Sequence, residues 1–337
     1  MARVLICGLG SIGRRHLRNL MAQGVEDIVL VRTGKSTLPD EELKGMPVEA
    51  DIETALKRHR PQAVIVSNPT ALHLDVAIPA ARAGCHLLIE KPVSHSLAGL
   101  EELRSAVRAG GGQVLIGFQF RFHPGLRLAK QMVDGGAIGR PLSMRAHWGE
   151  HLADWHPWED YRGSYAARAD LGGGAVLTLC HPFDYLRWIL GDVVAVSART
   201  GRLSDLALGV EDVAEAVLEF QSGVLGSVHL DYYQRPACHW MEIVGTLGTV
   251  RWDNADGTLR SWVGEQDGWA VHPAPAGFER NDMFVAEMRH FLALVGGEAS
   301  TPVCTLEDGE RTLRLAIGVL DSSRERRLVS FSEGTSG

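Results

Sequence analysis

The hydrophobic positions in the first third of the chain alternate between short continuous runs and longer segments with helical spacing. The continuous runs, rich in Val, Leu and Ile, predict buried strands at residues 3–7, 27–31, 63–67, 86–89 and 114–118. The segments between them predict helices at residues 12–23, 52–57, 74–83 and 97–109. Because strands that alternate with helices of this length build βαβ units, we expect a parallel sheet covered on both faces.

The pattern changes beyond residue 122, where strand signals follow one another closely. Residues 213–220 and 224–232, and then 240–244 and 249–252, form pairs joined by short glycine-containing turns, which are typical of antiparallel hairpins. A further strand is predicted at 141–149, and helices at 124–133, 175–190, 284–294 and 306–324. We therefore expect two domains. Residues 1–122 form a doubly wound α/β domain, and residues 123–337 form an α+β domain with a large, mostly antiparallel, open-faced sheet, with the last helices as candidates to pack back on the first domain.

Composition favours a folded globular protein. The 337 residues are 45% hydrophobic and 22% charged, with a net charge of −7, which argues against nucleic-acid or anionic-membrane partners. No apolar run approaches the ~20 residues that span a bilayer.

The five scattered cysteines form no C-x-x-C pair, so we expect buried thiols in a reducing cytoplasm. His147, His151 and His156 lack an accompanying cysteine or carboxylate frame, and no metal site is expected.

A glycine-rich turn lies between the first predicted strand and the first predicted helix. Its sequence, Gly8-Leu9-Gly10-Ser11-Ile12-Gly13, is G-x-G-x-x-G. In this context Gly8 permits a tight turn, Gly10 lets a pyrophosphate approach the backbone, and Gly13 lets the helix pack close to the strand. The helix N-terminus, with Ser11 and Ile12, offers unpaired N–H groups to the phosphates, as in a Rossmann domain. The alternative is a plain glycine turn in an α/β protein.

The residues after the second strand decide which dinucleotide is expected. The sequence there, Val31-Arg32-Thr33-Gly34-Lys35-Ser36, has no Asp or Glu to accept hydrogen bonds from a ribose 2′-hydroxyl. Arg32, Thr33 and Lys35 could hold a 2′-phosphate through charge-assisted hydrogen bonds. We therefore expect NADP(H) to be preferred, with NAD(H) possible. In the alternative interpretation Arg32 and Lys35 are solvated loop cations.

Three further motifs follow in order along the chain. Ser67-Asn68-Pro69-Thr70 ends the third predicted strand and Glu90-Lys91-Pro92 ends the fourth, while Gly172-Gly173-Gly174 precedes His181-Pro182-Phe183-Asp184. Together with the glycine turn they resemble the Gfo/Idh/MocA oxidoreductases, the glucose–fructose oxidoreductase and inositol dehydrogenase family, across nearly the whole chain. The resemblance implies a dinucleotide domain and a sheet domain, with the substrate bound between them over the nicotinamide.

The resemblance also implies roles for individual residues. Lys91 matches the lysine near the reacting carbon, and His181 matches the histidine that exchanges the hydroxyl proton. Ser67, Asn68 and Pro69 would line the nicotinamide ribose, and the expected cofactor-binding set also includes His73 and Glu90.

The chemistry fits these two residue types. Histidine has a pKa near neutrality and suits the removal of a hydroxyl proton as hydride leaves the carbon. Lysine can stabilise the developing alkoxide. One departure concerns the Asp that family members carry three or four residues before the histidine, because this chain has Leu177 and Thr178 there. Thr178 could bind a substrate hydroxyl, and Asp184, one helical turn after His181, could polarise the imidazole or pack the helix.

Other side chains are candidates for substrate binding. Trp155, Trp158 and Tyr161 could stack on a sugar ring or close a cleft by hydrophobic contact. Arg121, Arg162 and Arg235 could bind a substrate carboxylate or phosphate, or form ion pairs.

The sequence therefore predicts a cytoplasmic NAD(P)-dependent oxidoreductase acting on a sugar, a sugar nucleotide or a cyclitol. Two alternatives stay open: an NAD-dependent glycosidase of the same family, and a non-catalytic dinucleotide-binding sensor. Because an open sheet face needs cover, we also expect a homodimer or homotetramer that associates through the second domain's sheet.

Overall fold

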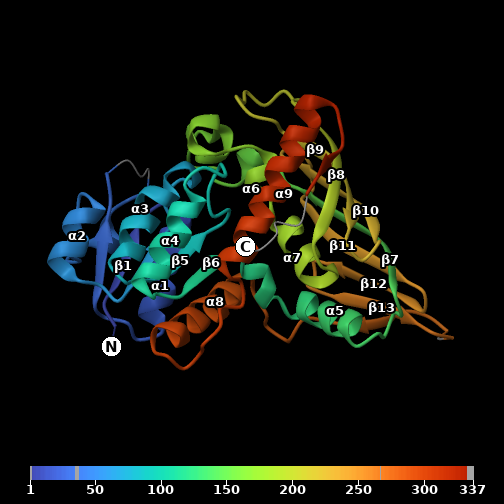
Figure 1. Ribbon diagram of the computed structural model, residues 1–337, viewed down its shortest axis with the longest axis horizontal. Coiled ribbons are helices and arrows are strands. Elements are labelled where there is room, and N and C mark those ends of the chain that lie inside the picture. Colours follow the sequence, from blue (N-terminus) through green and yellow to red (C-terminus); the bar gives the residue numbers. More distant parts are fainter. Residues whose placement is uncertain (1, 35–37, 266, 332–337) are drawn as a thin grey trace. The chain divides into compact units, whose positions relative to one another are not determined.

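The computed structural model describes residues 2–34, 38–265 and 267–331 (Figure 1). These residues divide into two compact units. The first contains the chain up to Gln119 together with Asp170–Gly172 and Glu279–Leu313. The second contains Phe120–Ala169, Gly173–Phe278 and the chain from Arg314 onward. Each unit has its own sheet and core, and each is described separately below.

The first unit is built on a parallel sheet, as the sequence predicts, and this sheet has six strands. The strands lie in the order β3-β2-β1-β4-β5-β6, the order of a dinucleotide-binding fold. They are β1 (Val4–Cys7), β2 (Ile28–Val31), β3 (Val48–Glu49), β4 (Ala63–Val66), β5 (His86–Glu90) and β6 (Val114–Gly117). Every residue of β1, β2, β4 and β6 is buried, because helices cover both faces and an apolar side chain is favoured at each position. The two-residue strand β3 was not predicted.

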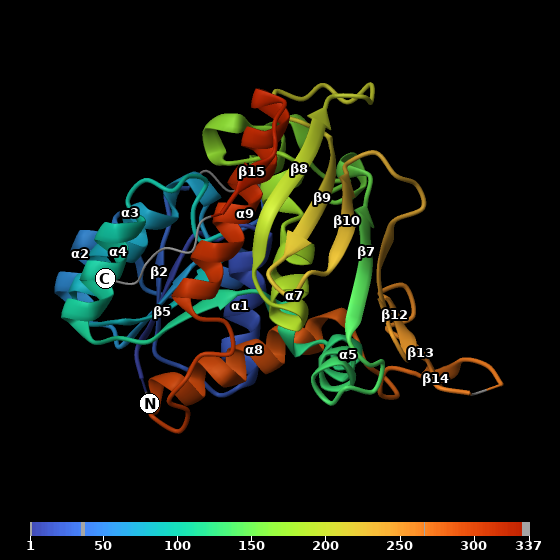
Figure 2. The same cartoon turned by 45° about the vertical axis from the view of Figure 1, so that its right-hand side comes forward.

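The helices of this unit pack in two groups. Helix α3 (His73–Arg82) contacts both α2 (Ile52–His59) and α4 (Leu100–Gly110), whereas α1 (Ser11–Ala22) contacts α8 (Arg280–Val295), as Figure 2 shows. Helix α9 (Leu306–Glu325) begins in this unit and continues into the second. Short 3₁₀ turns are present at Glu41–Leu43 and Thr70–Leu72.

The second unit is built on a large, mostly antiparallel sheet, as predicted, and this sheet has nine strands. Its order is β14-β13-β12-β11-β7-β10-β9-β8-β15, and its central neighbours β7 and β10 run parallel. The strands are β7 (Pro141–Gly149), β8 (Val193–Gly201), β9 (Val213–Phe220), β10 (Leu225–Asp231), β11 (Cys238–Gly245), β12 (Gly248–Asp253), β13 (Leu259–Val263), β14 (Ala270–His272) and β15 (Val329–Ser330). Buried and exposed residues alternate along β9, so one face of the sheet is covered and the other is open. Strands β8, β13, β14 and β15 were not predicted.

Among the described residues, the second unit has three helices ahead of α9. Helix α5 (Pro124–Asp134) contacts α7 (His181–Leu190) and β12, and α7 contacts β7. Irregular 3₁₀ turns occur at Gln119–Phe122, Leu152–Asp154, Tyr161–Gly163, Tyr165–Ala167 and Ala169–Leu171.

The prediction of one continuous helix over residues 175–190 is wrong. The structure has a short helix α6 (Ala175–Thr178) and then α7, which begins at His181. Pro182 explains the break, because it has no N–H to donate to the carbonyl of Thr178. Proline is instead favoured in the first turn of a helix, the position that it occupies in α7. The break places His181 at the start of α7.

Among the residues that the structure describes, no helix is both long and apolar enough to cross a bilayer.

Two tryptophans on neighbouring strands provide a test of which sheet face is the core. Trp252 on β12 is fully buried among aromatic rings, whereas Trp262 on β13 is 39% exposed. We expect Trp252→Ala to lower the free energy of unfolding by about 3–5 kcal/mol, because it leaves a large cavity. Trp262→Ala should change it by less than about 1 kcal/mol. Urea unfolding measures both, and equal losses would contradict the assignment of the buried face.

Candidate functional site

The glycine turn of the first unit requires glycine at its two ends. Gly8 has φ +95°, and a Cβ there would lie 2.4 Å from the backbone nitrogen of Asn68. A Cβ on Gly13 would lie 1.9 Å from the carbonyl oxygen of Gly8. By contrast, a Cβ on Gly10 would meet no atom within 4 Å. The outer two glycines therefore allow β1, α1 and the end of β4 to approach closely, while Gly10 borders open space.

The start of α1 fits a diphosphate. Gly10 is its N-cap and provides no side-chain hydrogen bond, and the first turn contains no acidic residue. The first N–H groups of a helix have no partner within the helix and carry partial positive charge. The N–H groups at Ser11 and Ile12 can therefore bind an anion, as the phosphate-binding turns of dinucleotide domains do.

The ends of β4 and β5 are held beside this turn by hydrogen bonds. The Ser67 hydroxyl lies 2.9 Å from the carbonyl oxygen of Gly8 and can donate to it. The buried His73 ring lies between two carbonyl oxygens, with Nδ1 2.9 Å from that of Pro92 and Nε2 3.0 Å from that of Asn68. Burial lowers the pKa of His73. The Lys91–Pro92 peptide is cis. The structure thus brings Ser67, Asn68, His73 and the chain next to Lys91 together, with Pro69 following Asn68.

A buried cluster of ionisable groups lies next to Lys91 in the sequence. Glu90 Oε1 lies 2.7 Å from His16 Nε2. A carboxyl oxygen of Glu287 on α8 lies within 4.8 Å of the nearby side-chain atoms of both residues. Burial raises the pKa of Glu90, but its hydrogen bond to His16 and the charges of His16 and Lys91 outweigh that effect and lower it overall. Burial, together with the charge of Glu90, raises the pKa of Glu287 well above its usual value. Glu90 is therefore the ionised member, and Glu287 is neutral.

The loop after β2 contains an acidic group that the sequence reasoning missed. Arg32 Nη1 lies 2.7 Å from Asp40 Oδ1, and the buried Arg14 also contacts Asp40, at 3.3 Å. The hydrogen bond from Arg32 lowers the pKa of Asp40. Thr33 is exposed, and Lys35 lies outside the described residues. No local sequence signal links Arg14 to Asp40, because their contact depends on how the loop folds over the glycine turn.

In the second unit, His181 lies in an aromatic cluster. It is 2% exposed, and its ring centroid lies 4.9 Å from that of Phe120 and 5.4 Å from that of Trp148. Trp148 stacks in turn on His239, at 4.3 Å. Thr178, the last residue of α6, is also buried. The break between α6 and α7 thus positions Thr178 and His181 on either side of a short non-helical link.

Arg121 and Asp184 bind each other. The guanidinium Nη2 and Nε of Arg121 lie 2.8 and 3.0 Å from the two carboxylate oxygens of Asp184, and both side chains are buried. This bidentate pair fixes α7 against the segment before α5. The two residues that were predicted as separate substrate contacts therefore form one ion pair.

The other predicted substrate residues lie along the irregular segment and the turn after β10. Trp155 packs edge-on against Tyr232, whereas Trp158 is 62% exposed. The Tyr161 hydroxyl accepts a hydrogen bond from the Ala207 N–H at 3.0 Å.

The remaining two arginines form exposed ion pairs. Arg162 binds Asp160 through Nε and Nη2, at 2.8 and 2.6 Å. Arg235 binds Asp154 at 3.1 Å and lies 2.8 Å from Nδ1 of His151.

Glu211 is a half-buried carboxyl group that the sequence reasoning did not select as a site residue. Its Oε1 accepts a hydrogen bond from the Val176 N–H at 3.1 Å, at the start of α6, and a Cβ on Gly174 would lie 2.3 Å from the same oxygen. Burial raises the pKa of Glu211 to about 7. This places a group that titrates near neutrality at the glycine-rich start of α6.

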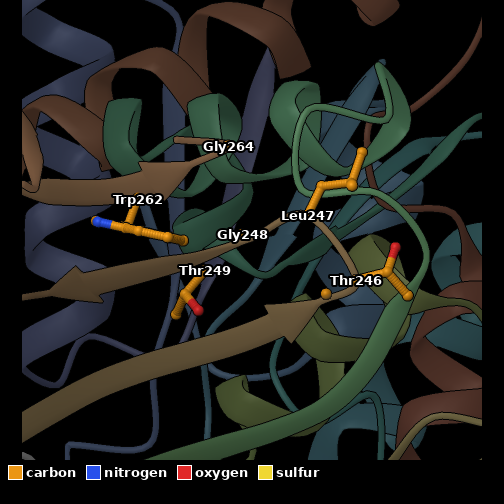
Figure 3. A pocket seen from close by; sticks show the side chains of 7 residues that line it. Thr246, Leu247, Gly248, Thr249, Trp262 and Gly264 are labelled. Atoms are coloured by element: carbon orange, nitrogen blue, oxygen red, sulfur yellow. The ribbon is translucent and has the colours of Figure 1, made fainter. Parts of the chain in front are cut away.

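A separate surface hollow of about 330 Å³ lies at the turn between β11 and β12 (Figure 3). Its lining includes no residue that the sequence predicted for the site, and consists of Gly245, Thr246, Leu247, Gly248, Thr249, Trp262 and Gly264.

The strand order of the parallel sheet, with its glycine turn at the start of α1, is that of a dinucleotide-binding Rossmann fold. Residues 2–118 match the family model described as "Oxidoreductase family, NAD-binding Rossmann fold", and residues 126–251 match "GFO/IDH/MocA C-terminal domain". The chain belongs to the Gfo/Idh/MocA oxidoreductase family.

Curated relatives and solved structures agree with this assignment. The chain is 28% identical to myo-inositol 2-dehydrogenase of Thermotoga maritima, over 98% of this chain and 99% of that protein. It is 27% identical to scyllo-inositol 2-dehydrogenase (NAD(+)) of Bacillus subtilis, over 94% and 92%. A levoglucosan dehydrogenase solved with NADH and levoglucosan shares the fold, with a TM-score of 0.85 and 20% identity over 98% of this chain and 100% of that one.

The neutral carboxyl group of Glu287 predicts a pH-dependent cost in stability. Since its folded-state pKa is raised, its stabilising effect is complete below the unfolded pKa, near pH 4, and is lost as the pH rises toward the folded value. Glu287→Gln is neutral at every pH. We expect its free energy of unfolding to rise relative to that of wild type between about pH 4 and pH 8, so that the variant becomes relatively more stable. Urea unfolding across this range measures the difference. The exposed Glu53→Gln is the control, and a pH-independent effect of Glu287→Gln would contradict the assignment.

Proposed function

We propose that the protein is an NAD(P)-dependent dehydrogenase or reductase that acts on a CH–OH group of a sugar, a sugar nucleotide or a cyclitol. The observation that carries this proposal is the anion-binding start of α1, held by hydrogen bonds beside the strand ends that lead to Lys91. The names of the relatives support the substrate class, because the two inositol dehydrogenases cover almost the whole chain.

The proposed chemistry assigns one step to each of two residues. A bound nicotinamide would supply the hydride acceptor or donor. In the oxidative direction the carbinol C–H leaves as hydride, the O–H proton passes to His181, and the carbon becomes a carbonyl. Lys91 donates a hydrogen bond to the oxygen and stabilises its developing negative charge. In the reductive direction His181 returns the proton.

The surroundings of each residue support these roles. The ionised carboxyl group of Glu90 lies next to Lys91 in the chain and favours the charged ammonium form. His181 is buried, and its ring lies against Phe120 and Trp148, which keep bulk water from it. Where water is excluded, the effective dielectric constant is low, and the electrostatic interactions that stabilise the alkoxide and the protonated imidazole are stronger.

Substitution of the two residues tests the proposal. We expect His181→Ala to lower kcat by about 10²–10⁴-fold through loss of the proton acceptor. Lys91→Ala should lower kcat by about 10²–10³-fold through loss of the charge that stabilises the alkoxide. Turnover is followed by the absorbance of reduced nicotinamide across a stereochemically diverse panel of sugars and cyclitols. The exposed Lys57→Ala is the matched control, and unchanged turnover in both site variants would refute the assignment.

The same experiment separates the two alternative functions. A glycosidase that uses tightly bound NAD would retain the cofactor through purification and cleave glycosides without net reduction of added nucleotide. A non-catalytic sensor would bind NAD(H) or NADP(H) normally and turn over no member of the panel. Failure to bind either dinucleotide would contradict all three functions.

We also propose that NADP(H) is preferred, with NAD(H) accepted. Arg32 lies at the end of β2, where the ribose hydroxyls of a dinucleotide are recognised in this fold. Its guanidinium can bind a 2′-phosphate once it leaves Asp40. Asp40 therefore competes with the phosphate for Arg32.

Two substitutions with opposite effects test this preference. Arg32→Ala should lower kcat/KM for NADP⁺ by about 10-fold or more, the loss expected for one charge-assisted hydrogen bond, and change that for NAD⁺ little. Asp40→Ala should raise kcat/KM for NADP⁺ because it removes the competing carboxylate. Steady-state kinetics with each cofactor decides the matter. A wild-type enzyme that prefers NAD⁺, or an equal loss for both cofactors in Arg32→Ala, would reject the proposal.

We further propose a homodimer or homotetramer that associates through the open face of the second unit's sheet. This face exposes apolar side chains on four strands, namely Val217, Leu225, Trp262 and Val271. Burial of such side chains against a second copy is favourable. We expect light scattering to give a mass above that of one chain, and the double variant Val217→Glu, Leu225→Glu to lower it. A monomeric wild-type protein at working concentration would contradict this proposal.

We also propose that the protein is located in the cytoplasm. The cysteines that support it are present as thiols, with Cys7 and Cys85 deep in the core of the first unit. Unbridged thiols are typical of proteins in reducing compartments.

A further inference from the structure

Two histidines lie side by side on the open face of the second unit's sheet. His147 on β7 and His229 on β10 are direct partners in the register of the parallel pair. Their rings are stacked, with centroids 4.4 Å apart and planes at 18°. Asp231 lies two residues after His229, so its side chain leaves the strand on the same face. The sheet therefore holds three metal-ligating side chains on two adjacent strands.

The ligand atoms of these side chains converge. His229 Nε2 lies 3.0 Å from Asp231 Oδ2, and His147 Nε2 lies 4.0 Å from the same oxygen. One ligand atom from each of the three residues lies within 4.8 Å of the other two. A fourth candidate ligand, Oε1 of Gln234, lies 2.5 Å from His147 Nε2.

Backbone contacts aim the carboxylate at the histidines. Asp231 Oδ1 accepts hydrogen bonds from the N–H groups of Tyr233 and Gln234, at 2.9 and 2.7 Å. Its other oxygen, Oδ2, therefore points toward the two rings. Gly149 faces Asp231 across the strand pair, and a Cβ there would lie 2.2 Å from Oδ2 and 2.4 Å from Oε1 of Gln234. Only glycine at this position leaves room for both oxygens.

His229 lies between two acidic side chains. Its Nδ1 lies 2.5 Å from Glu215 Oε1, while its Nε2 faces Asp231. A neutral imidazole has one N–H and cannot donate to both carboxylates. Either a second proton or a metal ion must lie between Nε2 and Asp231. Donation of the opposite N–H to a carboxylate is the arrangement found around metal-bound histidines.

We propose that His147, His229 and Asp231 form a binding site for one divalent first-row transition-metal ion of the Zn²⁺ class. Two imidazole nitrogens and one carboxylate oxygen are a ligand set that suits this class. Gln234 Oε1 or a water molecule supplies the fourth position. The ion joins β7 to β10 and has a structural role. The expectation of no metal site considered His147 only with His151 and His156, whereas its partners here lie far away in the sequence.

Metal titration of the full, tag-free chain tests this site. After treatment with a chelator, the wild-type protein should bind one Zn²⁺ per chain with a micromolar or lower Kd by calorimetry. Co²⁺ should give the visible absorption bands of a tetrahedral site, and Zn²⁺ should abolish them. Zn²⁺ should also raise the unfolding temperature, because it binds the folded state alone.

Four variants locate the ion. His147→Ala and His229→Ala should each weaken Zn²⁺ binding by at least about 100-fold, since each removes a ligand, and Glu215→Gln should weaken it by about 10-fold through loss of the supporting hydrogen bond. The matched control is His272→Ala on β14 of the same sheet, which should bind Zn²⁺ as the wild type does.

Two results would overturn the proposal. One is the absence of saturable binding of Zn²⁺ by wild type, or binding of equal strength in His147→Ala and His229→Ala. The other comes from the imidazole NMR signals of the unmutated protein and does not depend on how the variants fold. If His229 stays doubly protonated through neutral pH and its signals do not respond to Zn²⁺, a proton occupies the position assigned to the ion.

Discussion

The close approach of backbone to backbone at the glycine turn is the constraint on which the first unit depends. Gly8 and Gly13 let β1, the start of α1 and the end of β4 come within distances that any side chain would prevent. The same approach allows the Ser67 hydroxyl to donate to the turn, and the His73 ring lies between carbonyl oxygens that follow β4 and β5. The anion site at α1 and its close packing against the end of β4 are thus consequences of one steric condition.

Much of the architecture could be predicted from local patterns. The buried strands of the first unit are continuous apolar runs, and the hairpins of the second are marked by glycine turns. Strand β13 was missed because its polar Ser261 is buried and its apolar Trp262 is exposed, which reverses the expected alternation. Strand β8 does alternate from Val196 to Arg199, so its pattern was present but was overlooked. Strands β3 and β15 are too short to give a signal. The break between α6 and α7 could have been predicted from Pro182, whose effect on the preceding turn is local.

The side-chain networks of the candidate site could not be predicted in the same way. The contacts between His16, Glu90 and Glu287, and the ion pair of Arg121 with Asp184, join residues that only the tertiary fold brings together. The sequence indicated the residue types at Lys91 and His181 but not the groups that set their charge. Glu211 was not selected as a site residue, because its raised pKa results from desolvation in the folded protein, which the sequence does not show.

The parallel pairing of β7 with β10 has a consequence for how the second unit forms. Parallel neighbours cannot be joined by a tight turn, and here α6, α7, β8 and β9 all lie between them in the chain. The middle of the sheet therefore closes only after this long stretch of polypeptide is in place, at a large cost in loop entropy. Topologies with so many distant pairings assemble slowly, so the centre of this sheet is expected to be among the last parts of the nascent chain to become protected from hydrogen exchange.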